Sequence, residues 1–348
     1  MDQEGRIDGT GGGHDALDEG RTALALKRKV SRDRIRRLRR SSANVPTDLA
    51  RTSAFAPRRS GLKTVNFKRT YVVGDSIVEV EGRELGTQHR DALYALFKLE
   101  PKSVRMKAEE PGLPMMNFVL VQVSWREMLH ALNLNEHQTN LKTVLKTFEQ
   151  LRSVNIRVYA GGLDAYNSAQ VTGELPEGEG YSDNLLGKIH WTGKALDSTL
   201  TVQYGDWLRE VIRTDFVGLR PEYFHLTSDY AKTILPFIES NLDAKSLNEA
   251  DIGRLVDRDI SNESRQQVFK FRGYVDIAFN DMQRVGAIKS FQVEEIWEGR
   301  KKFMRYSWER AGRAVPAVAD SEPAKRPVRR RRLGRKGDAN DSQTTLPL

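Results

Sequence analysis

The chain has 348 residues, no cysteine and a formal net charge of +9. This length predicts about two domains with accessory segments, and the lack of cysteine excludes disulfides, thiolate metal sites and a cysteine nucleophile. No apolar run approaches the roughly 20 residues that span a bilayer, and the polar, acidic start differs from a secretory signal. We therefore expect a cytoplasmic protein that makes no contact with a membrane.

The positive charge is concentrated in two segments. Residues 27–40 hold nine basic residues and one acid, and residues 325–336 hold eight basic residues and no acid. The rest of the chain holds 39 basic and 46 acidic residues, so it is not basic overall. The two segments are either plain solvated tails or a source of attraction to phosphate that ignores base sequence. Any DNA-binding site in the folded part must instead lie on a particular surface.

Residues 1–60 combine a glycine-rich acidic start with the first arginine-rich run, and we expect them to form a disordered arm. Ordered structure is predicted from about Asn66, where apolar and polar residues alternate on both sides of a Gly-Asp pair, as in two strands joined by a turn. Apolar residues at helical spacing then predict a first helix over residues 84–99. An N-terminal domain is predicted to span residues 61–216.

A helix-turn-helix is predicted within this domain. Ser124 is a suitable N-cap for a helix over residues 125–134, and a second helix is predicted over 136–151, after a break at residues 133–135. Strands are predicted from residue 155 to residue 208, with a loop rich in Gly, Asp and Asn after the first strand. A helix-turn-helix followed by β hairpins is typical of a winged helix, whose second helix enters the major groove of DNA.

The same order of elements recurs toward the C-terminus. Gly218 and Pro221 interrupt helical periodicity in residues 217–226, which are predicted to be a linker. The pattern then predicts a helix over 227–242, a helix from Ser246 with Glu249 as its capping-box partner, a turn at 259–262, a long helix over 263–288 and two strands around a turn at 298–301. Residues 227–312 are therefore predicted to be a second winged-helix domain, followed by a disordered basic tail over 313–348. The expected fold class is α+β, with two tandem winged-helix domains between the two tails.

The long helix over 263–288 carries the main candidate site. Its apolar residues recur at helical spacing and predict a buried stripe, and the opposite face near its start carries Asn262, Gln266 and Lys270, with Arg265 and Arg272 on the flank. Asn and Gln pair with adenine, whereas Arg and Lys pair with guanine or phosphate, so these residue types suit a helix in the major groove. The alternative is an ordinary solvated helix face. Further candidate DNA contacts are, in the first helix-turn-helix, Gln138, Lys142 and Lys146, and, in the second wing, Lys301 and Lys302.

Several stretches of the chain carry a family resemblance over about residues 48–308. They are LARTSAFAPRR, VEVEGRELGTQHRDALYALFKL, SWREMLHALNLNEHQTNLKTVLKTFEQL and FRGYVDIAFNDMQRVGAI. Together they resemble bacterial plasmid replication initiators of the RepA and TrfA kind. The resemblance implies two winged-helix domains that bind directly repeated origin sequences, with the C-terminal domain making the main base contacts and the N-terminal domain assisting and mediating dimerisation.

The same resemblance implies a set of sites and partners. It points first to the helix with Arg265, Gln266, Lys270 and Arg272, and second to the helix with Lys142 and Lys146. It also implies a bacterial host, a homodimer in equilibrium with a monomer, and recruitment of a replicative helicase. The arginine-rich arm and the basic tail depart from the family pattern.

The last six residues, QTTLPL, resemble the short peptide by which bacterial replication proteins bind the sliding clamp. In such a peptide the amide of Gln343 would anchor one end, while Leu346 and Leu348 would fill an apolar pocket. The alternative is a polar tail that ends in leucine by chance.

No motif in the sequence supports catalysis. The six histidines include no closely spaced pair of the kind that rolling-circle relaxases use, and no glycine cluster is followed by Lys-Ser or Lys-Thr at Walker spacing. We expect no enzymatic activity, no metal and no cofactor. Three functions remain open: an origin-binding initiator, a winged-helix transcriptional repressor that uses the same DNA contacts, and a relaxase with Tyr181 or Tyr274 as nucleophile.

Overall fold

The computed structural model describes residues 42–51, 54–73, 76–106, 116–174, 179–209, 216–298 and 301–312. The basic runs at 27–40 and 325–336 and the final peptide lie outside the described residues, so the predictions made for them stay predictions. The described residues up to Ala311 belong to one compact unit. None of the helices in these ranges is both long enough and apolar enough to cross a bilayer.

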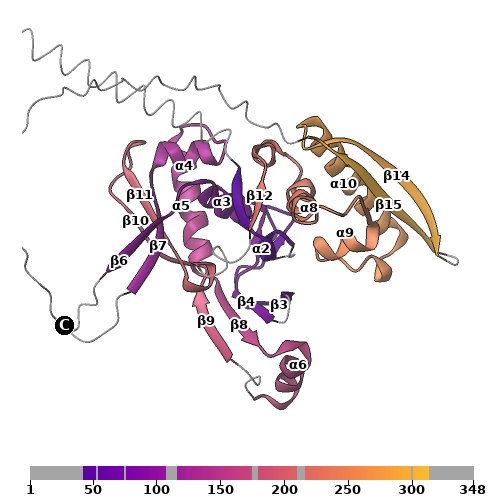
Figure 1. Cartoon of the computed structure of the whole chain (residues 1–348), viewed down its shortest axis with the longest axis horizontal. Coiled ribbons are helices and arrows are strands. Elements are labelled where there is room, and N and C mark those ends of the chain that lie inside the picture. Colours follow the sequence, from indigo (N-terminus) through magenta and orange to yellow (C-terminus); the bar gives the residue numbers. More distant parts are fainter. Residues whose placement is uncertain are drawn as a thin grey trace, which may run out of the picture. The chain divides into compact units, whose positions relative to one another are not determined.

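A winged helix, which we call the N-terminal module, extends from α3 (Thr87–Lys98) to β11 (Thr199–Tyr204) (Figure 1). Its other elements are β6 (Lys102–Met106), β7 (Met116–Ser124), α4 (Trp125–Ala131), α5 (Gln138–Arg152) and β10 (Leu186–Trp191). The strands form an antiparallel sheet in the order β10-β11-β7-β6. Ser124 caps α4 as predicted, and the carboxylate of Glu127 accepts the Ser124 N–H at 2.9 Å. The first helix-turn-helix is therefore confirmed.

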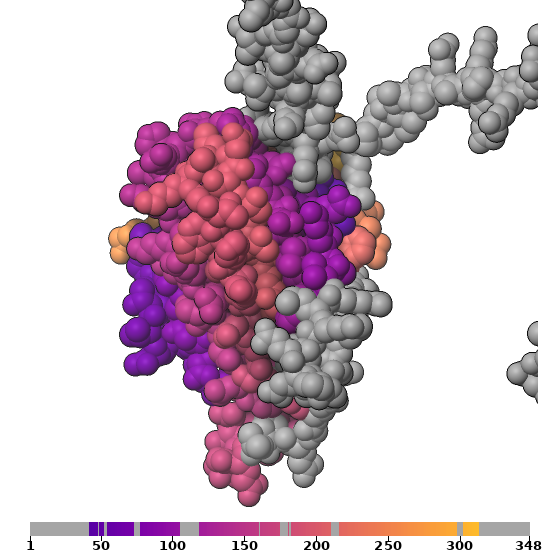
Figure 2. All heavy atoms as spheres, turned by 90° about the vertical axis from the view of Figure 1, so that its left-hand side faces the viewer, coloured from indigo at the N-terminus to yellow at the C-terminus, as the bar shows by residue number. Residues whose placement is uncertain are grey.

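An insertion separates α5 from β10. Its elements are β8 (Asn155–Ala160), α6 (Gly162–Thr172) and β9 (Glu179–Asn184). The two strands β8 and β9 form a sheet with β3 (Phe67–Val73) and β4 (Ser76–Gly82), in the order β3-β4-β8-β9. The loop predicted after β8 is wrong in part, because α6 occupies it. Tyr166 and Ala169 lie three residues apart and are buried, and the Tyr166 hydroxyl donates to the buried Glu79 carboxylate at 2.7 Å. Figure 2 shows residues of this insertion at the lower end of the surface formed by β10 and β11.

The described segment before β3 is ordered, which corrects the disorder predicted for residues 42–60, whereas residues 1–41 lie outside the described residues. From residue 42 the structure holds β1 (Ala43–Pro46), α2 (Thr47–Arg51) and β2 (Phe55–Ala56). β1 pairs antiparallel with β12 (Phe216–Leu219), and β2 pairs in parallel with β5 (Leu85–Gly86). Ala43, Val45 and Phe55 are buried. Strands this short show little periodicity in the sequence. Their order depends on partners that are remote in the chain.

Residues 217–226, which the sequence predicted to be a linker, are ordered. They continue β12 and then form the 3-10 helix η1 (Pro221–His225), in which Pro221 occupies the first turn. The side chains of Leu219, Tyr223 and Phe224 are buried. Gly218 lies within β12, Pro221 begins η1, and apolar packing holds this segment between the two winged helices.

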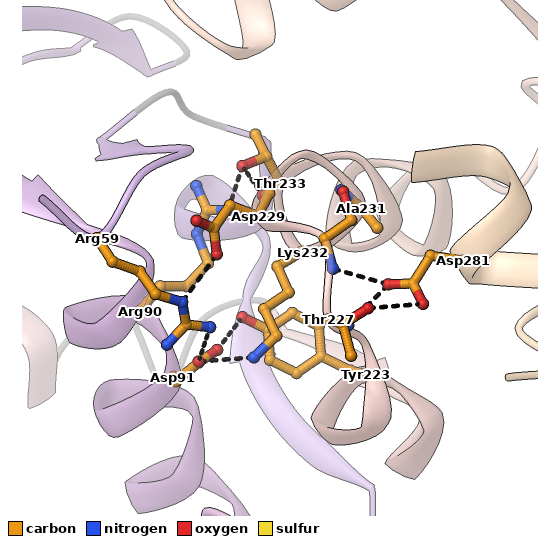
Figure 3. Close-up of polar contacts among 11 residues, drawn as sticks. Arg59, Arg90, Asp91, Tyr223, Thr227, Asp229, Ala231, Lys232, Thr233 and Asp281 are labelled. Carbon is orange, nitrogen blue, oxygen red and sulfur yellow. Dashed lines mark hydrogen bonds and ion pairs between the residues drawn. The ribbon is translucent and has the colours of Figure 1, made fainter. Parts of the chain in front are cut away.

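A partly buried polar cluster joins α3 to η1 and α8 (Asp229–Ser240) (Figure 3). The Asp91 carboxylate accepts hydrogen bonds from the Lys232 ammonium at 2.7 Å and from the Tyr223 hydroxyl at 3.0 Å, and Arg59 lies 3.5 Å away. We call these four residues the Asp91 cluster. Close to it, the buried Arg90 donates to the Thr233 hydroxyl at 2.6 Å. The two winged helices therefore share buried polar contacts.

The second winged helix, which we call the C-terminal module, begins with α8. Its further elements are β13 (Ser246–Asn248), α9 (Glu249–Leu255), η2 (Ile260–Asn262), α10 (Arg265–Arg284), β14 (Ile288–Glu298) and β15 (Lys301–Arg310). The strands form an antiparallel sheet in the order β13-β15-β14, and β14 and β15 make a long hairpin beside α10 (Figure 1). The predicted buried stripe of α10 is confirmed, since Phe271, Val275 and Phe279 are fully buried and the ring of Phe279 stacks on Tyr306 at 5.1 Å.

The start of α9 differs from the prediction. Ser246 lies in β13, and Asn248 is the N-cap, with its N–H donated to the Asp251 carboxylate at 3.3 Å. Glu249, the expected capping partner, is buried and instead pairs with Arg272 of α10. The pairing of β13 with β15 explains the shift, because it keeps Ser246 and Asn248 extended.

Both helix-turn-helix turns contain a residue with left-handed backbone. Asn133 follows α4 with φ of 56°, and Asp257 follows α9 with φ of 58°. Asn and Asp tolerate this conformation better than other side chains. In the second turn, a Cβ at Gly253 would lie 2.6 Å from Ile260 Cγ1 and 2.9 Å from the Arg258 carbonyl oxygen. Glycine is therefore required there for the turn to pass close to α9.

Candidate nucleic-acid interface

The first turn of α10 is fixed by a capping box. The Ser264 hydroxyl accepts the Gln267 N–H at 3.4 Å, and Gln267 Oε1 accepts the Ser264 N–H at 2.9 Å and its O–H at 2.8 Å. The Gln267 side chain is thus committed to the helix start. The cap sets which side chains of the first turns point away from the core.

Arg265, Gln266 and Lys270 lie on the exposed side of these turns. None of the three side chains has a hydrogen bond or ion pair to another described residue. Their donors are therefore available near a helix N-terminus, where the helix dipole also favours negative charge. The amide of Gln266 can donate to and accept from one base edge, and the two cations can contact guanine or phosphate. The opposite side of α10 is the buried stripe, so this surface is open to a ligand.

Arg272 and Asn262, which were predicted to contact DNA, have partners within the protein. Arg272 Nε and Nη2 donate to the Glu249 carboxylate at 2.7 and 2.9 Å, and Nη2 also donates to the Lys302 carbonyl oxygen at 3.1 Å. The hydrogen bonds to Glu249 raise the pKa of Arg272 above its ordinary value, despite partial burial. Asn262 Nδ2 donates to the Asp259 carboxylate at 2.6 Å. Arg272 therefore holds α10 against α9 and β15, and Asn262 belongs to the turn.

The wing residues lie on β15 opposite an acidic stretch of β14. Lys302 forms an ion pair with Glu295 and is opposite Trp297 in the strand register. Lys301 occupies the position opposite Glu298. Trp297 is exposed, although its indole is apolar. The wing therefore carries both charges beside an exposed aromatic ring.

The second helix of the helix-turn-helix in the N-terminal module, α5, shows the same kind of surface. Gln138, Lys142 and Lys146 are exposed at four-residue spacing on α5, and none of their side chains has a hydrogen bond or ion pair to another described residue. The imidazole of His137, the N-cap residue, accepts the Thr139 N–H at 3.3 Å. The structure thus places an exposed polar stripe on the second helix of each helix-turn-helix, α5 and α10.

Two residues on the exposed side of α10 were missed by the sequence prediction. Phe269 is 77% exposed on α10, and Gly273 lies four residues later. A Cβ at Gly273 would meet no atom within 4 Å, so packing inside the chain does not require glycine. Glycine within a helix costs about 1 kcal/mol relative to alanine. Phe269 could have been found from the helical period, because it falls outside the buried stripe.

Two tyrosines were named as possible nucleophiles of a relaxase. Tyr274 is half exposed, and its ring stacks on Tyr230 with centroids 5.4 Å apart. Tyr181 lies in β9, and its side chain is outside the described part of the chain. The described residues include no group of three or more Asp, Glu or His side chains arranged to hold a metal ion.

Comparison with known proteins gives a likeness of fold. No protein-family model matches the sequence, and no curated protein matches it. A crystal structure of domains 2 and 3 of RctB, with selenomethionine, is 12% identical with a TM-score of 0.51, over 76% of this chain and 98% of that one. A second crystal structure of these domains is 11% identical with a TM-score of 0.47, over 76% and 96%. The Pi initiator protein, in complex with iteron DNA, is 11% identical with a TM-score of 0.38, over 64% and 90%. The chain therefore shares the fold of RctB domains 2 and 3, and the predicted α+β architecture of tandem winged helices is confirmed.

Proposed function

We propose that this chain is a sequence-specific double-stranded DNA-binding protein that acts as a plasmid replication initiator. The observation that carries the proposal is the open surface of Arg265, Gln266 and Lys270 on the second helix of a helix-turn-helix that is followed by a long wing. A helix so placed enters the major groove with its N-terminal residues toward the base edges. The proposal contains no catalytic step, and recognition is its only chemistry.

Each part of the surface has its own role in this proposal. Gln266 reads adenine, and Arg265 and Lys270 contact guanine or phosphate, with about 1–3 kcal/mol of discrimination for each good base contact. Arg272 is a positioning residue, because its guanidinium is held by Glu249. On α5, Gln138 contacts a base edge, and Lys142 and Lys146 bind phosphates. Lys301 and Lys302 of the wing also bind phosphates.

The tandem arrangement favours an initiator over a repressor. The two modules differ in sequence and lie in one chain, so a single chain offers two unlike recognition helices. Such a chain suits an asymmetric site that is repeated in one direction, whereas a symmetric repressor dimer suits an inverted repeat. The resemblance to plasmid replication initiators points the same way. The alternative remains a winged-helix transcriptional repressor that uses the same contacts.

The partners of the proposal follow from the same resemblance. They are directly repeated origin DNA, a replicative helicase and a second copy of the chain, in a dimer that is in equilibrium with the monomer, in a bacterial cytoplasm. A further partner is the sliding clamp, which Gln343, Leu346 and Leu348 would bind. Removal of residues 343–348 is expected to abolish clamp binding and leave DNA affinity unchanged. Equal retention of the full-length and shortened proteins on immobilised clamp would end this part of the proposal.

Footprinting of the purified protein on DNA flanking its own gene tests the function directly. Protected direct repeats, with centres separated by whole turns of about 10.5 bp, support an initiator. A single inverted repeat over the promoter would instead support the repressor. Magnesium-dependent cleavage of supercoiled DNA would contradict both and favour a relaxase.

Substitution of the α10 surface tests which residues recognise the site. Gln266→Ala and Lys270→Ala should each weaken binding to the protected sequence by about 1–3 kcal/mol and weaken binding to unrelated DNA much less. Lys245→Ala is a matched control, because Lys245 is an exposed lysine of the same module away from α10. Similar losses on both kinds of DNA would place the recognition surface elsewhere.

A further inference from the structure

Phe269 and Gly273 form an apolar strip in the middle of the exposed side of α10. Residues three, four and seven positions after Gln266 share its side of a helix, and these are Phe269, Lys270 and Gly273. At about 1.5 Å per residue, the exposed side from Gln266 to Gly273, which includes the strip, is roughly 10 Å long. This length is comparable with the width of the DNA major groove, about 12 Å.

Contacts within the chain explain neither residue. The Phe269 side chain is 77% exposed and stacks on no other described ring, whereas Phe271 and Phe279 of the same helix are fully buried. Gly273 has helical backbone with no positive φ, and a Cβ there would meet no atom within 4 Å. It therefore differs from Gly253, where a Cβ would collide with Ile260. A large exposed aromatic ring next to an unneeded glycine indicates contact with another molecule.

The neighbours of the strip identify the kind of molecule. Lys270 follows Phe269 directly, Gln266 lies one turn before it, and Arg265 begins the helix. All three side chains are exposed, and none is paired to another described residue. The strip is thus bordered by cations and an amide on the first turns of a helix. This border is complementary to the edges and phosphates of a duplex, and an acidic partner of that shape is DNA.

The major groove offers one apolar group on its base edges, the C5 methyl group of thymine. We propose that Phe269 packs against the methyl group of a thymine, and that Gly273 lets the sugar–phosphate wall of the groove approach the helix backbone. This inference rests on the proposed function and adds to it a base that the polar residues do not read. Phe269 is thereby a specificity-determining residue, and Gly273 sets how deep the helix lies.

The test replaces thymine by deoxyuridine, which lacks only this methyl group. Each thymine of the protected site is replaced in turn, and the affinity of the full chain is measured by fluorescence anisotropy at constant salt. Wild-type protein should lose about fourfold in affinity at one or two of these positions, as expected for the loss of one buried methyl group in each modified site. Phe269→Ala should bind the unmodified site more weakly and should show no further loss at those positions.

Two more variants separate this reading from a loss of folding. Gly273→Ala should bind the site more weakly while its thermal midpoint rises, because alanine favours the helix. Leu242→Ala is a matched control, since Leu242 is an exposed apolar residue of the same module that lies outside α10. It should change neither affinity nor the response to deoxyuridine.

The outcomes discriminate between the inference and the function on which it rests. A clear footprint with affinity that ignores every deoxyuridine, or with the same loss in Phe269→Ala, would overturn the thymine contact alone. The absence of any footprint would overturn the proposed function and the inference with it. A change from dimer to monomer in sedimentation of free Phe269→Ala would assign the strip to self-association and also overturn the inference.

Discussion

The Asp91 cluster allows a quantitative prediction for Asp91→Ala. Lys232 is buried, with its side chain 7% exposed, and its ammonium lies 2.7 Å from the carboxylate that this change removes. The Tyr223 hydroxyl, which is also buried, loses its acceptor at 3.0 Å. Burial, followed by the charge of Asp91, raises the pKa of Tyr223 well above its ordinary value, so the hydroxyl remains a donor in need of a partner.

The expected loss of stability follows from the burial of Lys232 and the exposure of Arg59. Leaving a buried charge without its partner costs about 3–5 kcal/mol, whereas the contribution of the half-exposed Arg59 is small. Whole domains are stable by only about 5–15 kcal/mol, so this loss is a large part of the free energy of unfolding. Lys232→Met in the Asp91→Ala background should recover most of the loss, because it removes the unpaired charge and fills the same space.

Urea denaturation, followed by tryptophan fluorescence and circular dichroism, measures both effects. The midpoint of Asp91→Ala should fall sharply with an unchanged slope, and the double variant should lie between it and the wild type. Arg59→Ala is the control on the exposed edge of the cluster and should change the midpoint little. A loss below about 1 kcal/mol in Asp91→Ala, or no recovery in the double variant, would refute the reasoning.

Two further predictions concern pH and salt. Burial lowers the pKa of His89 to about 4, and its imidazole accepts the Gly86 N–H at 2.9 Å. Because the unfolded chain binds this proton with a pKa of about 6.5, stability should fall by about 3 kcal/mol as the pH drops from 6.5 to 4. His89→Gln should remove this part of the pH dependence of the urea midpoint, whereas the control His190→Gln, at an exposed histidine, should keep it. Equal curves for the wild type and both variants would contradict the assignment of this pH dependence to His89. Deletion of residues 1–40, which leaves β1 intact, should reduce the slope of log affinity against log salt by about 0.9 for each phosphate that the arm contacts, and an unchanged slope would show that the arm is not on the DNA.

The sequence predicted those elements whose signals are local. The stripe of α10 repeats at the helical period from Val268 to Met282, and Ser124 with Glu127 forms a capping box within four residues. Such patterns need no knowledge of remote contacts. β1 is different, because its partner Leu219 lies far from Ala43 in the chain and the strand has only four residues. Its order comes from tertiary pairing, which no local window contains.

The candidate site shows the same division. The helical period placed Gln266 and Lys270 on the exposed side of α10, and the structure leaves both there without a partner among the described residues. The period could not show that Arg272, on the flank, pairs with Glu249 at the start of another helix. A flank residue can face either solvent or a neighbouring helix, and only the packing of α9 decides which.

The pairing of β1 with β12 has a consequence for the basic arm. Ala43 is held against Leu219, the strand residue that leads into the segment between the two modules. Only three peptide steps separate Arg40 from Ala43, a reach of at most about 11 Å. We therefore expect any phosphate contacts of this run to depend on that reach, and a glycine spacer inserted before Ala43 should weaken them by lowering the effective concentration of the run at the DNA.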